Sequence, residues 1–137
     1  GALKWVQAYL KSFEERGCGH FVYVSSLSSR YPFPFRANYS AAKAYTSMVF
    51  ECFKKKYCSS GIDFSVFYPG IIETEMSAQA PVPEFFKFPV SKAARKILDT
   101  LPKGSQSVRF PLRAIFLEWV LAVVPDRLIL GLMDKKI

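Results

Sequence analysis

The chain reads Phe21-Val22-Tyr23-Val24-Ser25-Ser26 near its start and, after a loop, Tyr39-Ser40-Ala41-Ala42-Lys43. The first four residues, 21–24, are apolar without polar alternation, which predicts a strand that is buried on both faces, as in a parallel sheet covered by helices. The glycines of Gly17-Cys18-Gly19 predict the end of a preceding amphipathic helix, whose apolar residues start at Leu3. The second run predicts the start of the next helix.

A second predicted strand, Ile62 to Tyr68, ends at Pro69-Gly70. A helix from about Tyr39 to Tyr57 separates the two strands. Because parallel neighbours are joined by right-handed crossovers, this order predicts an α/β fold with a parallel sheet between layers of helices.

The remaining helices and strands are predicted from hydrophobic periodicity, from capping residues and from prolines. Asn38 is the expected N-cap of the helix over 39–57, and Ser91 is the expected cap of a helix over 92–100. A short strand is expected at 106–110, followed by two helices at 112–124 and 126–135, separated by Pro125. The apolar face of the helix over 39–57 is predicted to consist of Ala41, Ala42, Tyr45, Met48, Val49, Cys52 and Phe53.

Composition limits the class of protein. A chain of 137 residues with 50% hydrophobic residues has enough apolar material for one packed domain. The net charge of +8 comes from scattered basic residues, so a nucleic-acid partner is not expected. Cys18, Cys52 and Cys58 are predicted to be reduced, mostly buried thiols of an intracellular protein. The lone His20 has no partner ligands in the sequence, and no metal site is predicted.

The C-terminal region, 111–137, is predicted to be a helical extension of the domain. Its longest uncharged run within 113–134 is the seven residues from Trp119 to Pro125, whereas a spanning helix needs about 20. The alternatives are simple packing on the body of the protein, closure of an apolar cleft, and attachment to a membrane surface. The protein is expected to be intracellular, either in the cytoplasm or associated with the endoplasmic reticulum membrane.

Three polar side chains in the opening stretch predict a site for proton transfer. Residues four apart on a helix share a face, so Tyr39 and Lys43 point the same way. A neighbouring ammonium stabilises the phenolate form of a tyrosine. Ser26 follows a strand at the carboxyl end of the sheet, where open α/β sheets bind their ligands. Serine then orients and polarises a substrate oxygen, tyrosine transfers the proton, and lysine tunes the tyrosine.

These residues resemble the C-terminal half of a short-chain dehydrogenase/reductase. The resemblance is carried by Val24-Ser25-Ser26, by Tyr39-Ser40-Ala41-Ala42-Lys43 at the family's spacing from Ser26, and by Tyr68-Pro69-Gly70-Ile71-Ile72-Glu73-Thr74. It implies the C-terminal part of a Rossmann-like, doubly wound parallel sheet with three α/β/α layers and two C-terminal helices, and a single, partial NAD(P)-binding domain over 1–137.

The resemblance also implies an activity and its site: hydride transfer between a nicotinamide and a carbonyl or secondary alcohol. Ser26, Tyr39 and Lys43 are the implied catalytic residues, and the cofactor is NADP or NAD, with NADP favoured. The implied cofactor-binding residues are Tyr39, Lys43, Pro69, Gly70, Ile72 and Thr74. The family's Gly-rich phosphate turn and the asparagine of its catalytic tetrad are expected upstream of Gly1, so the chain alone is predicted to be inactive.

Within the family, the chain is most similar to the branch that reduces 3-oxoacyl thioesters or 17-ketosteroids. The segment Pro81 to Val90 corresponds to the substrate loop, so an apolar, fatty acyl or steroid-like substrate is expected to contact Ser26, Phe85 and Phe86. Pairing of two copies through the helix over 39–57 is implied as well. The alternative is a non-enzymatic fragment or degenerate homologue that serves as an interaction module.

Overall fold

The computed structural model describes residues 1–31, 36–78, 83–125 and 127–128. Its sheet has three parallel strands in the order β1-β2-β3, which are β1 (Gly19–Val24), β2 (Ile62–Pro69) and β3 (Ser107–Phe110). All three strands lie where the sequence predicted them, and the α/β fold class is confirmed. The helix predicted over 126–135 falls almost entirely outside the described residues.

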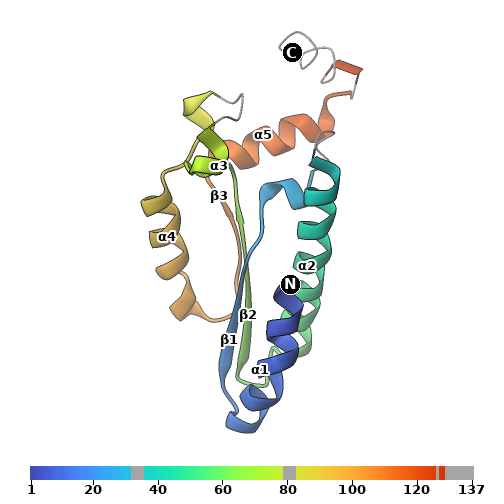
Figure 1. Cartoon of the computed structure of the whole chain (residues 1–137), viewed down its shortest axis with the longest axis vertical. Coiled ribbons are helices and arrows are strands. Elements are labelled where there is room, and N and C mark those ends of the chain that lie inside the picture. Colours follow the sequence, from blue (N-terminus) through green and yellow to red (C-terminus); the bar gives the residue numbers. More distant parts are fainter. Residues whose placement is uncertain (32–35, 79–82, 126, 129–137) are drawn as a thin grey trace.

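Helices cover both faces and one end of the sheet (Figure 1). α1 (Ala2–Arg16) and α2 (Ala37–Lys56) lie on one face, α4 (Val90–Leu98) lies on the other, and α5 (Leu112–Val123) crosses the end at which the strands finish. The short elements described in the connections are η1 (Leu27–Ser29), α3 (Glu75–Ala78), η3 (Glu84–Phe86) and η4 (Leu101–Lys103).

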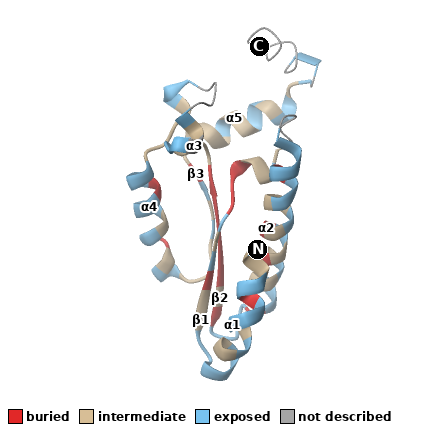
Figure 2. Ribbon diagram, viewed as in Figure 1, coloured by how far each residue is buried: buried red, intermediate tan, exposed pale blue. Residues whose placement is uncertain are grey.

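The central strand β2 forms the core (Figure 2). Phe64 and Val66 are fully buried on the side of α1 and α2, whereas Phe67 is fully buried with Ala93 of α4 on the other side. Successive residues of a strand point to opposite faces, so an apolar run without alternation suits a strand with helices on both sides.

The prediction that the first strand is buried on both faces is wrong. Phe21 is buried against the α1 side, but Val22 and Val24 are 39% and 45% exposed. The strand order explains the difference, because β1 is an edge strand here, while the cluster around α4 is built on β2 and β3.

The face of α2 that packs on the sheet differs in part from the prediction, although Phe53 packs on the core as expected. The buried residues are Ser40, Ser47 and Phe50, whereas Tyr45 and Met48 are each 65% exposed. The buried Ser47 hydroxyl is satisfied by a 2.6 Å hydrogen bond to Ser25 Oγ, which allows a polar residue to lie inside. The N-cap position is Arg36 instead of Asn38, and the cap of α4 is Pro89 instead of Ser91.

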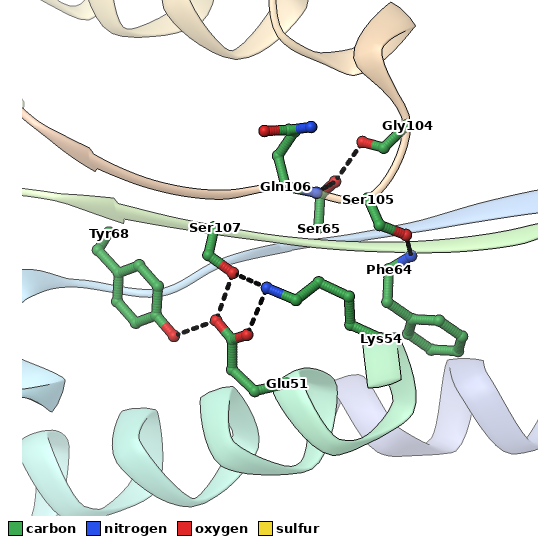
Figure 3. Close-up of polar contacts among 9 residues, drawn as sticks. All are labelled: Glu51, Lys54, Phe64, Ser65, Tyr68, Gly104, Ser105, Gln106 and Ser107. Carbon is green, nitrogen blue, oxygen red and sulfur yellow. Dashed lines mark hydrogen bonds and ion pairs between the residues drawn. The ribbon is translucent and has the colours of Figure 1, made fainter. Parts of the chain in front are cut away.

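A polar network joins α2 to β2 and β3 (Figure 3). The carboxylate of Glu51 accepts hydrogen bonds from Tyr68 Oη at 3.0 Å and Ser107 Oγ at 2.6 Å, and pairs with Lys54 Nζ at 2.6 Å. Burial, followed by the charge of Glu51, raises the pKa of Tyr68 to about 12. Burial alone would raise the pKa of Glu51, but the hydrogen bonds from Lys54, Ser107 and Tyr68 and the charge of Lys54 outweigh it and lower that pKa. The network holds the helix that carries Tyr39 in a defined position on the sheet.

The cysteine prediction is partly wrong, because Cys18, Cys52 and Cys58 are all free but exposed.

His20 bonds to the buried Ser65 Oγ at 2.8 Å. Within the described ranges, no group of three His, Cys, Asp or Glu side chains is arranged to hold a metal ion. The helices of the described part are also too short or too polar to cross a membrane.

Candidate active site

Ser26 lies at the end of β1, where the chain turns into η1. Its hydroxyl accepts a hydrogen bond from Ser28 N at 3.2 Å and so caps this short helix. A serine hydroxyl has one proton and two lone pairs, so this bond leaves the Ser26 proton free to donate to a ligand. The preceding Ser25 has a structural place, since its Oγ bonds to Ser47 Oγ and its N–H donates to Phe67 O at 2.7 Å.

Tyr39 and Lys43 lie in the first two turns of α2, on one face as predicted. The Lys43 ammonium is 5.9 Å from the centroid of the Tyr39 ring and 5.1 Å from that of Tyr23 on β1. Its Nζ donates a 2.8 Å hydrogen bond to Val24 O, two residues before Ser26. Lys43 therefore joins α2, which carries Tyr39, to the end of β1, the strand that precedes Ser26.

Exposure and charge differ between these two side chains. Tyr39 is 42% exposed, whereas Lys43 is half-buried. Burial lowers the pKa of the Lys43 ammonium. The hydrogen bond to Val24 O and the two nearby aromatic rings stabilise the charged ammonium. Among the hydrogen bonds of the described residues, none joins Ser26 to Tyr39.

The predicted cofactor residues of the segment 69–74 follow β2 at the same end of the sheet. Pro69 is buried, and Gly70 N donates to Phe110 O at 2.8 Å. Ile72 forms a parallel bridge with Phe88, which fixes the course of the segment. Thr74 is exposed, and its N–H donates to Ser77 Oγ at 2.9 Å.

Gly70 is where α5 packs on this end of the sheet. A Cβ at this position would lie 2.8 Å from Ala114 Cβ of α5 and 3.6 Å from Leu27 Cδ1 of η1. Glycine therefore lets α5 approach the strand ends closely. Arg30 and Glu118, 3.5 Å apart, add an ion pair between α5 and the residue after η1.

The predicted substrate residues lie along α5 and not against the serine. Phe85 and Phe86 of η3 stack edge to face, with ring centroids 5.4 Å apart. Together with α5 they line an open hollow of about 580 Å³, whose other lining residues are Leu112, Arg113, Phe116, Leu117 and Val120. Arg113 was not among the residues predicted for the site; the signal for it is that it is the single basic residue of α5, whose other residues are apolar except for Glu118.

Comparison with known proteins identifies the family. The sequence model of the family described as short chain dehydrogenase matches residues 1–84. Dehydrogenase/reductase SDR family member 7B of Danio rerio is 33% identical over 90 residues, which are 66% of this chain and 29% of that protein. An uncharacterized oxidoreductase of Myxococcus xanthus is 31% identical over 128 residues, or 93% of this chain and 47% of that protein. The chain thus spans less than half the length of these relatives.

Solved structures agree with this assignment. A short chain dehydrogenase from Burkholderia cenocepacia J2315 in complex with NADP matches with a TM-score of 0.75 and 27% identity, over 96% of this chain and 54% of that one. A short-chain dehydrogenase from Sphingobium yanoikuyae in complex with NADPH has a TM-score of 0.72 at 20% identity, over 97% of this chain and 52% of that one. The Rossmann-like fold and the resemblance read from the motifs are confirmed: this chain belongs to the short-chain dehydrogenase/reductase family.

Proposed function

We propose that the protein is an NAD(P)(H)-dependent oxidoreductase that transfers hydride between a nicotinamide and a carbonyl or secondary alcohol carbon, and that this chain is its catalytic half. The observation that carries the proposal is the bond from Lys43 Nζ to Val24 O. It joins the helix that carries Tyr39 and Lys43 to the last residue of β1, two residues before Ser26, in a chain of this family.

The residues present fit a nicotinamide cofactor. An ammonium has three N–H donors, and Val24 O is the described acceptor of one of them, so Lys43 keeps donors for ribose hydroxyls. The exposed Thr74 and the backbone of Pro69, Gly70 and Ile72 lie at the same end of the sheet. NADP is favoured over NAD, in line with the NADP and NADPH of the two structural relatives. When bound, the cofactor supplies or accepts the hydride.

The protein's own groups then have three tasks. Ser26 donates its hydroxyl proton to the substrate oxygen and orients it, while Tyr39 gives a proton to that oxygen or takes one from it. Lys43 stabilises the negative charge that develops on the tyrosine oxygen. Phe85 and Phe86 provide apolar surface for the remainder of the substrate, which we propose to be fatty acyl or steroid-like.

A cofactor titration tests the proposal. NADPH fluorescence should rise on binding to the full-length protein, and Lys43→Met should weaken binding by about tenfold, because it removes the donors to the ribose. Lys55→Met, at an exposed position of the same helix, is the matched control and should bind as the wild type does. Failure of the full-length wild type to bind NADPH or NADH would refute the proposal. The described part of the chain contains no Gly-rich turn between a strand and a helix, and we propose that the 137 residues alone bind the cofactor weakly and turn over negligibly.

A second role, as an interaction module, is favoured by the outer face of α2. Ala41, Tyr45, Met48 and Cys52 are exposed at helical spacing, and Trp5 of α1 is 65% exposed on the same side of the sheet. Contiguous exposed apolar side chains mark interaction surfaces, and we propose that two copies pair through this face.

Self-association should depend on the centre of that face. Met48→Asp in the full-length protein should raise the dimer Kd by about a hundredfold or more, because a charge would be buried without a partner. Ser59→Asp adds the same charge beyond the end of α2 and should leave the Kd unchanged. Sedimentation velocity measures both, and an unchanged dimer of Met48→Asp would exclude this interface. A dimer that lacks NADPH binding would favour the non-enzymatic role.

Peripheral membrane attachment through the C-terminal region is the remaining partner proposal. It is supported by the exposure of Leu112, Phe116, Trp119 and Val123 on α5. It would place the protein at a membrane surface such as that of the endoplasmic reticulum, whereas without it the cytoplasm is the proposed location.

A further inference from the structure

Arg113 lies in the apolar hollow between η3 and α5. The other side chains that line the hollow are hydrophobic, and the volume of about 580 Å³ is within the range of small-molecule sites, about 300–1,000 Å³. A charged group in such surroundings needs partners, because burial without them is costly.

The partners of Arg113 leave part of its guanidinium unused. Nη2 donates a 2.6 Å hydrogen bond to Lys87 O, and Cζ lies 5.2 Å from the centroid of Phe85 and 5.9 Å from that of Phe88. The Nε atom is buried and has no hydrogen-bond partner among the described residues. A guanidinium has five N–H donors in a planar fork that suits an oxyanion. Phe85, whose ring lies over the guanidinium, is 67% exposed, so displacement of this one surface ring would open the guanidinium to an acceptor.

No described carboxylate neutralises Arg113. The ion pairs of the described residues do not include it, since Glu84 pairs with Lys87 and Glu118 pairs with Arg30. The first turn of α5, to which Arg113 belongs, contains no acidic residue either. The hollow therefore combines a large apolar surface with one uncompensated positive charge.

We infer that this hollow binds an anionic amphiphile, with the apolar chain against Phe116 and Val120 and the oxyanion on Arg113. The shared chemistry is an alkyl or acyl chain that ends in a carboxylate or a phosphate. The amphiphile is the enzyme's substrate if the proposed function holds, and only that identification rests on it. Arg113 then determines specificity for acidic over neutral chains.

Calorimetric titration of the full-length protein with dodecanoate, dodecyl phosphate and dodecanol tests the inference, with the two anions below their micelle concentrations and dodecanol below its solubility limit. The wild type should bind at least one of the two anions about tenfold or more tightly than the alcohol, and the tighter anion identifies the group. Arg113→Met should abolish this preference and leave dodecanol binding unchanged. Arg113→Lys should restore part of it, because an ammonium keeps the charge but not the fork.

Two further variants separate recognition from general effects. Phe116→Ser should weaken binding of all three ligands, since it removes apolar contact only. Arg109→Met removes an exposed arginine of β3 and should retain the preference for the anion. Equal affinities in the wild type, an unchanged preference in Arg113→Met, or equal loss in Arg109→Met would each overturn the inference. None of these readouts uses NADPH, so the inference and the proposed oxidoreductase can fail independently.

Discussion

Replacing Tyr39 by Phe in the full-length protein should lower kcat by about 10²- to 10⁴-fold, because the substitution removes the proposed proton donor and little else. The ring stays beside the ammonium of Lys43, which lies 5.9 Å from its centroid, and the hydroxyl of Ser26 is untouched. NADPH affinity should therefore remain nearly that of the wild type. Steady-state loss of NADPH absorbance with a carbonyl substrate measures kcat, and fluorescence titration measures the affinity.

Tyr45→Phe is the matched control for this experiment. Tyr45 lies on the same helix, is 65% exposed, and is not part of the proposed site. Its kcat should equal that of the wild type. Wild-type turnover by Tyr39→Phe would show that another group transfers the proton, and the assignment of Tyr39 would be wrong.

Phe64→Ala should cost about 3–5 kcal/mol of the free energy of unfolding. Phe64 is fully buried in the central strand, and its removal leaves a cavity between the sheet and the two helices of that face. Four aromatic rings surround it at centroid distances of 5.0 to 5.7 Å, those of Phe21, Phe50, Phe53 and Tyr57. Urea denaturation followed by circular dichroism measures the loss.

Phe85→Ala is the corresponding control for stability. Phe85 is 67% exposed on η3, so removal of its ring should change the free energy of unfolding by less than about 1 kcal/mol. Similar losses for the two variants would contradict the burial described for β2. If Phe64→Ala does not fold at all, Phe64→Leu, which keeps most of the apolar volume, should fold and lose about half as much or less.

Helix α2 illustrates what periodicity misses. Its apolar residues occur on more than one side, so the pattern alone favoured the side with Tyr45 and Met48, whereas the sheet covers the side with Ser47 and Phe50. The buried side contains Ser47, a polar residue that the apolar pattern does not select. Ser47 can be buried because its hydroxyl bonds to Ser25, which is 22 residues away along the chain. A helical pattern cannot contain that information.

Local spacing was enough to predict strands at 20–24, 62–68 and 106–110, each within one residue of the observed bounds, and the shared face of Tyr39 and Lys43. Each of these features depends on backbone geometry over a few residues. Other features depend on where separate elements meet. The bond of Lys43 to Val24 O and the bonds of the Glu51 carboxylate to Tyr68 and Ser107 join residues that are 17 to 56 positions apart. Likewise, Arg113 bonds to Lys87 O, 26 positions away, and its Nε has no hydrogen-bond partner among the described residues. Such contacts are set by strand order, by register and by the packing of α5 on Gly70, which no single segment encodes.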